Sequence, residues 1–132
     1  EFNKFRKEKL VNWNFVDGMP IYLQIIDELT IRIARRDYLP GEKLPSVREV
    51  AIEAGVNPNT VQRALTELER RGLVRTERTS GRFVTEDESV LKEIHNNLSS
   101  EYIAEMIQKL RNIGMSDKEI IEAVTGCLRK EK

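Results

Sequence analysis

The stretch that decides the fold runs from residue 45 to residue 72 and reads PSVREVAIEAGVNPNTVQRALTELERRG. Ser46 and Glu49 form a capping box, in which each side chain bonds the backbone amide of the other residue, so a helix begins there. A glycine ends this short helix, and Asn57 with Pro58 begins the next one as N-cap and first helical residue. Two helices joined by so short a turn predict a helix-turn-helix.

The sequence on either side extends this motif. A helix is predicted over residues 20–36, because apolar residues recur there every four positions. Two short strands, 73–76 and 82–85, are predicted after the motif, with a polar loop that contains a glycine between them. A basic-tipped hairpin directly after a helix-turn-helix predicts a wing.

The residues after the wing, 86–132, are expected to form a two-helix tail. A long apolar stripe there needs a partner, and packing back onto the winged domain is the alternative to self-association. We expect self-association, because DNA readers of this kind usually bind paired half-sites. The predicted dimerisation residues are Leu91, Ile94, Leu98, Tyr102, Met106, Leu110, Ile113, Ile120, Val124 and Leu128.

Length and composition fit this organisation. The chain has 132 residues, of which 39% are hydrophobic and 33% charged. This suffices for one small domain with an appendage. We expect a mainly α fold with a small β-hairpin wing. Residues 1–85 are expected to form an arm with a docked aromatic end and a winged helix-turn-helix, and residues 86–132 the helical dimerisation region.

The charge is unevenly distributed. Lys and Arg together number 22, as do Asp and Glu, so the net charge is zero, which argues against a strongly basic DNA coat protein. Residues 20–85 carry 11 basic and 9 acidic side chains, whereas residues 86–132 carry 7 and 10. Nearly all basic residues of the first segment are arginines, which suit bidentate phosphate and guanine contacts.

The helix that begins at Asn57 carries the strongest functional signal. Its outer side chains can all hydrogen-bond base edges or phosphates, and recognition helices meet the major groove with their N-terminal residues. A merely solvated face is the alternative, but the first two turns contain neither Glu nor Lys. The predicted contacts are Asn57, Asn59, Thr60, Gln62, Arg63 and Thr66.

Two further elements are expected to contact DNA. Ser46 and Arg48 lie at the start of the preceding helix, where free amides and the helix dipole attract a phosphate. Arg48 adds a charge-assisted hydrogen bond there. In the wing, Arg78 and Arg82 flank a tip of small residues that includes Gly81, and we expect these three to meet a minor groove or a phosphate. A solvated hairpin is the alternative.

Catalytic and metal-binding patterns are missing from the sequence. His95 has no partner at ligand spacing, and Cys127, the single cysteine, lies beside the apolar stripe of the last predicted helix. We therefore expect no enzyme, no cofactor and no metal site. The charged N-terminal stretch, the single cysteine and the lack of an apolar run of about 20 residues predict a cytoplasmic protein without membrane contact.

Residues 20–85 resemble the GntR family of bacterial transcriptional regulators. The combination of matching segments is specific, although no single one is. They read PIYLQI (20–25), LPGEKLPSVRE (39–49), VNPNTVQRAL (56–65), LERRGLV (68–74) and GRFV (81–84). The wing of the family usually reads G-x-G-T-F-V. Here Thr79 stands at the first glycine and Arg82 at the threonine, which adds a positive charge.

The resemblance implies that Arg48, the start of the recognition helix and Gly81 bind DNA. The short tail after the wing is similar to that of YtrA-type members, whose two-helix tail dimerises and which are often repressors near transporter genes. Two helices cannot readily enclose a ligand pocket of about 300 Å³, so no effector is assigned. The expected function is a homodimeric repressor that reads a palindromic operator in double-stranded DNA. The alternative, which the zero net charge leaves open, is a winged-helix module that binds proteins.

Overall fold

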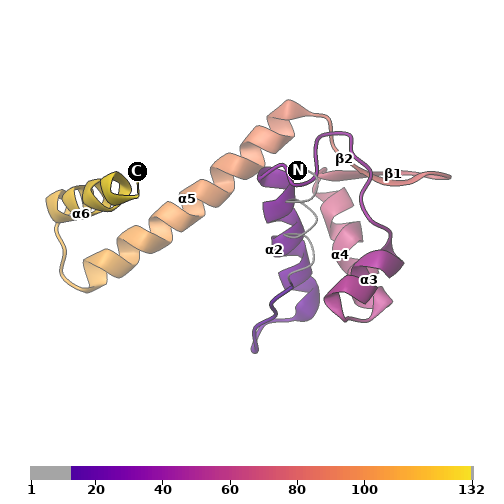
Figure 1. The fold of residues 1–132 in the computed structure, drawn as a ribbon, viewed down its shortest axis with the longest axis horizontal. Coiled ribbons are helices and arrows are strands. Elements are labelled where there is room, and N and C mark those ends of the chain that lie inside the picture. Colours follow the sequence, from indigo (N-terminus) through magenta and orange to yellow (C-terminus); the bar gives the residue numbers. More distant parts are fainter. Residues whose placement is uncertain (1–12, 132) are drawn as a thin grey trace. The chain divides into compact units, whose positions relative to one another are not determined.

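The computed structural model describes residues 13–131, so residues 1–12 of the predicted arm lie outside the described residues. Helices and one two-stranded hairpin follow each other as in Figure 1, which confirms the predicted mainly α fold with a small wing. The elements are α2 (Ile21–Ala34), α3 (Val47–Ala54), α4 (Pro58–Arg70), β1 (Val74–Glu77), β2 (Gly81–Val84), α5 (Glu88–Asn112) and α6 (Asp117–Lys130). None of the helices in this part of the chain has both the length and the apolar character that crossing a bilayer requires.

The core of the N-terminal unit lies between α2 and α4, with α3 packed on α4 (Figure 1). Apolar residues at helical spacing place one face of each helix inside, where burial of the side chains stabilises the fold. The innermost side chains are Ile25, Ile26, Leu29 and Ile33 from α2 and Val61, Ala64, Leu65 and Leu68 from α4. The two helices thus meet through continuous apolar faces.

The turn between α3 and α4 has the predicted local chemistry. The Glu49 amide donates to the Ser46 hydroxyl (3.1 Å) and the Ser46 amide donates to the Glu49 carboxylate (3.2 Å). Gly55 ends α3 with a φ of 68°, in the left-handed region that favours glycine. The side-chain oxygen of Asn57 then accepts the Asn59 amide (2.8 Å) and begins α4.

The wing is a tight antiparallel hairpin whose register runs from Val74 opposite Val84 to Glu77 opposite Gly81. The predicted strands differ from the observed ones by one residue at their ends. A third segment extends the sheet. The Leu44 amide donates to the Arg82 carbonyl (2.8 Å), and the Val84 amide donates to the Glu42 carbonyl (2.9 Å). The hairpin is thus tied to the loop before α3, a pairing that the sequence did not predict.

The start of α5 corrects one part of the predicted dimerisation stripe. Leu91 is only 5% exposed and belongs to the core of the winged helix, and Ile94 packs partly buried against that core. One compact unit accordingly extends to Ile94 and the other begins at His95, later than the division expected after residue 85. Helical spacing fixes which residues share a face, but it does not fix which surface covers them.

The end of the arm docks on α2, as predicted. Trp13 and Phe15 pack against the core, with their ring centroids 5.9 Å apart. The guanidinium of Arg32, itself buried, lies 4.4 Å from the centre of the Trp13 ring. Gln24 fixes the backbone before α2, because its amide group donates to the Val16 carbonyl and accepts the Val16 amide.

The C-terminal unit holds the rest of α5 and α6. Ser116 and Glu119 form a capping box at the start of α6. Their hydrogen bonds lower the pKa of the Glu119 carboxyl, the bond to the Ser116 backbone amide most of all. Ile120 is buried within this unit, but α6 packs little against α5. Much of the apolar surface on both helices therefore remains exposed.

We expect Leu91→Ala to lower the free energy of unfolding of the N-terminal unit by about 2–5 kcal/mol, because it leaves a cavity in the core. Urea denaturation followed by circular dichroism measures this. Ile52→Ala is the matched control, since Ile52 is 73% exposed on α3, and its effect should stay within about 0.5 kcal/mol. Weakened self-association of Leu91→Ala with an unchanged free energy of unfolding would contradict this and would show that Leu91 belongs to the dimerisation surface.

Candidate nucleic-acid interface

Helix α4, the predicted recognition helix, presents one polar face. Its apolar side chains point into the core, so the remaining positions turn outward. Of the residues predicted to contact DNA, Asn59, Gln62, Arg63 and Thr66 are exposed and Thr60 is half-buried. The structure thus brings the predicted donors and acceptors of the first turns of α4 together on one accessible surface.

Hydrogen bonds within the helix orient part of this face. The Thr66 hydroxyl donates to the Gln62 carbonyl (2.8 Å), and the Gln62 side-chain amide donates to the Thr66 hydroxyl oxygen (3.4 Å). These two side chains form a neighbouring pair one turn apart. The carboxamide oxygen of Asn57 serves as the helix cap, so the predicted DNA contact from this residue rests on its remaining amide group.

The arginines of the N-terminal unit fall into two groups. Arg70 and Arg71 bind Glu67, and Arg75 pairs with Glu77. Within residues 13–131, the arginines predicted to contact DNA have no acidic partner. They are Arg48 on α3, Arg63 on α4, and Arg78 and Arg82 in the wing. Unpaired guanidiniums keep their charge for an external anion, although Arg82 is half-buried and its Nε is covered by protein, so that only its terminal amino groups can reach an anion.

Glu67 is held by both neighbouring arginines. Arg70 Nε and Arg71 Nε donate to its carboxylate at 2.9 and 3.0 Å. The hydrogen bonds from Arg70 and then Arg71 lower the pKa of Glu67 to about 2. Because a carboxyl is charged above its pKa, Glu67 stays anionic at every pH at which the protein is handled. Glu67 therefore neutralises part of the positive charge in the C-terminal half of α4.

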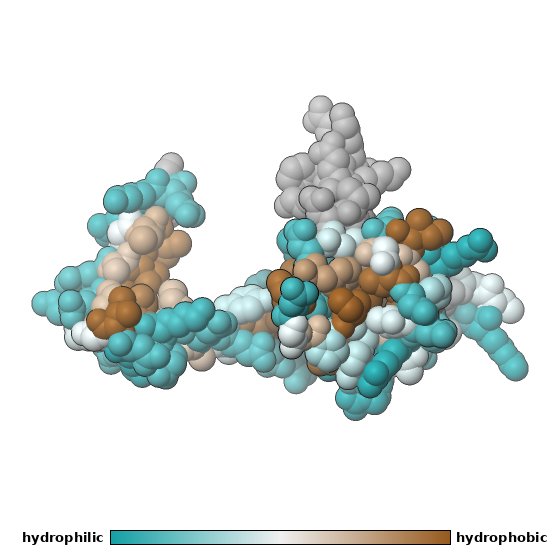
Figure 2. All heavy atoms as spheres, turned by 90° about the horizontal axis from the view of Figure 1, so that it is seen from below, coloured by the Kyte–Doolittle hydropathy of each residue, from teal (hydrophilic) through white to brown (hydrophobic). Residues whose placement is uncertain are grey.

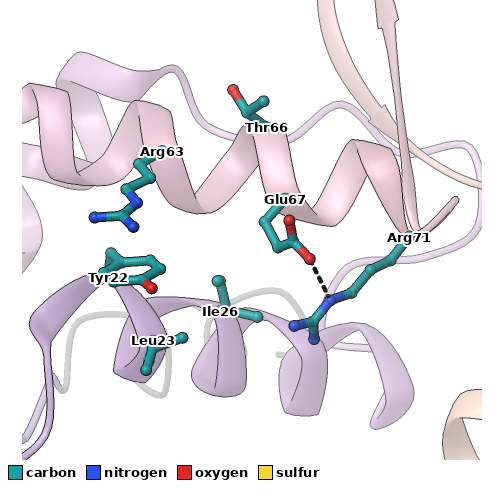
Figure 3. A pocket seen from close by; sticks show the side chains of 7 residues that line it. All are labelled: Tyr22, Leu23, Ile26, Arg63, Thr66, Glu67 and Arg71. Atoms are coloured by element: carbon teal, nitrogen blue, oxygen red, sulfur yellow. Dashed lines mark hydrogen bonds and ion pairs between the residues drawn. The ribbon is translucent and has the colours of Figure 1, made fainter.

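Arg63 leans toward α2. Its guanidinium carbon lies 3.6 Å from the centre of the Tyr22 ring. The two side chains line a pocket of about 500 Å³ between α2 and α4, together with Leu23, Ile26, Thr66, Glu67 and Arg71. Figure 3 shows the guanidinium above the ring, while Arg71 at the other end of the pocket is bound to Glu67. Arg63 is therefore fixed by an aromatic face and not by an acid.

The start of α3 and the wing flank this helix. Arg48 is exposed beside the capping box of Ser46. In the wing, Gly81 has a φ of 112°, and a Cβ there would stand 3.0 Å from the Lys43 side chain. Lys43 consequently adds a positive charge next to Gly81, beyond the predicted arginines 78 and 82.

Two features of this surface were missed by the sequence reasoning. Neither Tyr22 nor Lys43 is among the residues predicted to contact DNA. Both act through contacts with distant parts of the chain, Tyr22 with α4 and Lys43 with the wing. A tyrosine at the boundary of an amphipathic face is the signal that points to the first, since such a ring can pack against the core and still leave one face accessible.

Among residues 13–131, no three His, Cys, Asp or Glu side chains lie close enough together to hold a metal ion. The arrangement consists of neutral donors and acceptors, unpaired guanidiniums and a helix N-terminus, all of which bind phosphates and base edges.

Comparison with known proteins agrees with this geometry. Residues 21–84 match the model of the bacterial regulatory proteins of the gntR family. The HTH-type transcriptional regulator YhcF of Bacillus subtilis is 41% identical over 110 residues, which are 83% of this chain and 91% of YhcF. The chain belongs to the GntR family. It is accordingly a DNA-binding transcriptional regulator and not an enzyme.

Other relatives support the short architecture of this GntR protein. The HTH-type transcriptional repressor YtrA of B. subtilis is 46% identical over 68 residues, which are about half of each chain. A GntR-family regulator from Listeria monocytogenes is 35% identical, with a TM-score of 0.80 over 85% of this chain and 98% of its own. The DNA-binding domain of AraR, solved with operator ORX1, is 28% identical, with a TM-score of 0.50 over 56% of this chain and 90% of that domain.

We expect Glu67→Gln to raise the affinity for every DNA sequence, because Arg70 and Arg71 lose their anion and become available to phosphates. The plot of log affinity against log salt should steepen by up to about one unit. Since the pKa of Glu67 is about 2, the effect should be the same at pH 5 and pH 8. Fluorescence anisotropy measures both. Glu93→Gln, which removes the same charge from an exposed site on α5, is the control, and equal effects of the two variants would refute the pairing argument.

Proposed function

We propose that this GntR regulator is a homodimeric repressor that reads a palindromic operator. The observation that carries the DNA-reading part is the unpaired arginine set on α3, α4 and the wing, next to a polar recognition face. Each subunit would lay α4 in a major groove, where Asn59, Gln62 and Arg63 read bases. Arg48 and the wing would hold phosphates and set the register.

The exposed apolar stripe of the C-terminal unit supports the homodimer. Figure 2 shows hydrophobic side chains on its surface, bordered by hydrophilic ones. The exposed large apolar or aromatic side chains of the C-terminal unit are Tyr102, Ile103, Met106, Ile113, Ile121 and Leu128. A second copy of the chain would cover this surface and place a second reader on the DNA. After the correction at Leu91 and Ile94, the proposed stripe begins at Leu98.

The proposed regulatory output is repression of a transporter operon. Repression is supported by the similarity to YtrA of B. subtilis, whose name describes a repressor. A transporter operon is the target that the YtrA-type resemblance implies, and the site of action would be the cytoplasm, where bacterial DNA lies. The test is an anisotropy titration with the DNA upstream of the chain's own gene against a scrambled fragment. A preference of at least about a thousandfold is expected, with two subunits per site.

Arg63→Ala should cost roughly 1–3 kcal/mol of binding to the preferred fragment and relax the base preference at one position of each half-site. A titration against a panel of single-base operator variants shows this. An equal loss on all sequences would mean that Arg63 touches only phosphate.

Arg48→Ala is the matched comparison, because it removes the same unpaired side chain from α3. It should weaken all sequences about equally and reduce the salt slope by roughly one unit. Arg129→Ala in the last turn of α6 controls for loss of one exposed positive charge outside the predicted contacts, and it should change neither quantity.

Met106→Glu should convert the protein to a monomer, because it places an unpaired charge in the proposed apolar interface. Sedimentation equilibrium measures the mass, and binding to a fragment with two half-sites should weaken at least tenfold. Asn97→Glu introduces the same charge on the opposite face of α5 and should leave the dimer intact. A dimer that persists in Met106→Glu would contradict the proposed interface.

A further inference from the structure

The contact between Tyr22 and Arg63 has the geometry of a stacked pair. The guanidinium carbon lies 3.6 Å from the ring centre, which is about the separation of two planar groups in van der Waals contact. Tyr22 comes from the first turn of α2 and is half-buried, and Arg63 comes from the second turn of α4 and is exposed. The ring belongs to the apolar surface around the core, so it is held in place from below.

This stack leaves the hydrogen-bonding groups of Arg63 free. Among the residues that the structure describes, the guanidinium has no hydrogen-bond or ion-pair partner. A stacked guanidinium is covered on one face, whereas its five N–H groups point outward in its own plane. The side chain is exposed and lines the pocket between α2 and α4 (Figure 3).

Arg71 lines the same pocket as Arg63 but is held by an acid. Its Nε donates to Glu67 at 3.0 Å, which holds the side chain but also neutralises its charge and occupies a donor. An aromatic ring restricts an arginine without either cost. Restricting a long side chain before binding reduces the conformational entropy that it loses in the complex.

We propose that Tyr22 is a positioning residue for DNA recognition, which holds the Arg63 guanidinium by stacking so that its edge can donate to a base. This inference rests on the proposed function, in which Arg63 reads DNA. Tyr22 itself acts through Arg63. The competing explanation is that Tyr22 only packs against the core, in which case its loss would affect binding whether or not Arg63 is present.

The test is a double-mutant cycle measured by anisotropy on the preferred and the scrambled fragments. Tyr22→Phe keeps the ring and should leave the preference within about twofold of the wild type. Tyr22→Leu removes the aromatic face and should reduce the preference about two- to fivefold. In the Arg63→Ala background, Tyr22→Leu should have no further effect.

Each other outcome overturns a defined statement. The same loss from Tyr22→Leu with and without Arg63 overturns the positioning role, and a loss in Tyr22→Phe equal to that in Tyr22→Leu assigns the effect to the hydroxyl. A wild-type protein without any sequence preference overturns the proposed function and the positioning role together. A sequence preference without coupling between the Tyr22 and Arg63 substitutions overturns only the positioning role.

A measurement on the free protein keeps the inference testable even if Tyr22→Leu does not fold. The ring current of Tyr22 should shift the NMR signals of the Arg63 δ protons upfield in the wild type and in Tyr22→Phe. Random-coil positions for these protons in the folded wild type would overturn the stack directly.

Discussion

The apolar contact between α2 and α4 is the constraint on which the rest of the structure depends. Four aliphatic residues of α2 meet four of α4, all of them almost fully buried. Burying one face of α4 in this way necessarily turns its polar face outward. Helix α4 continues through the buried Leu73 into β1, so the contact that positions α4 also positions the start of the wing.

The zero net charge of the chain conceals a local excess of positive charge. Acids within the N-terminal unit are placed beside particular arginines: Glu28 beside Arg32, Asp37 beside Arg35, and Glu67 between Arg70 and Arg71. Arg48 and Arg63, which face outward, have no acidic partner within the described residues. The net charge counts all of these side chains alike, whereas only the unpaired arginines keep their full charge for an external phosphate.

Local features of the fold could be predicted from the sequence, because their causes lie within a few residues. The caps at Ser46 and Asn57 and the buried face of α4 follow from side-chain chemistry and helical period alone. The contacts of Tyr22 with Arg63 and of Lys43 with the wing join positions more than 35 residues apart, and no pattern in a single sequence encodes such a distance.

The start of α5 shows why periodicity alone merges two roles. A helically spaced stripe runs from Leu91 to Ile113. Leu91 nevertheless belongs to the winged-helix core and Ile94 packs against that core, whereas Tyr102, Met106 and Ile113 are exposed. Burial in the chain's own core and burial against a second subunit stabilise an apolar side chain in the same way, because the hydrophobic effect is not directional. Only the position of the core separates the two. Substitutions in the first two turns of α5 therefore act on folding, whereas those from Leu98 onward act on whatever covers the exposed stripe.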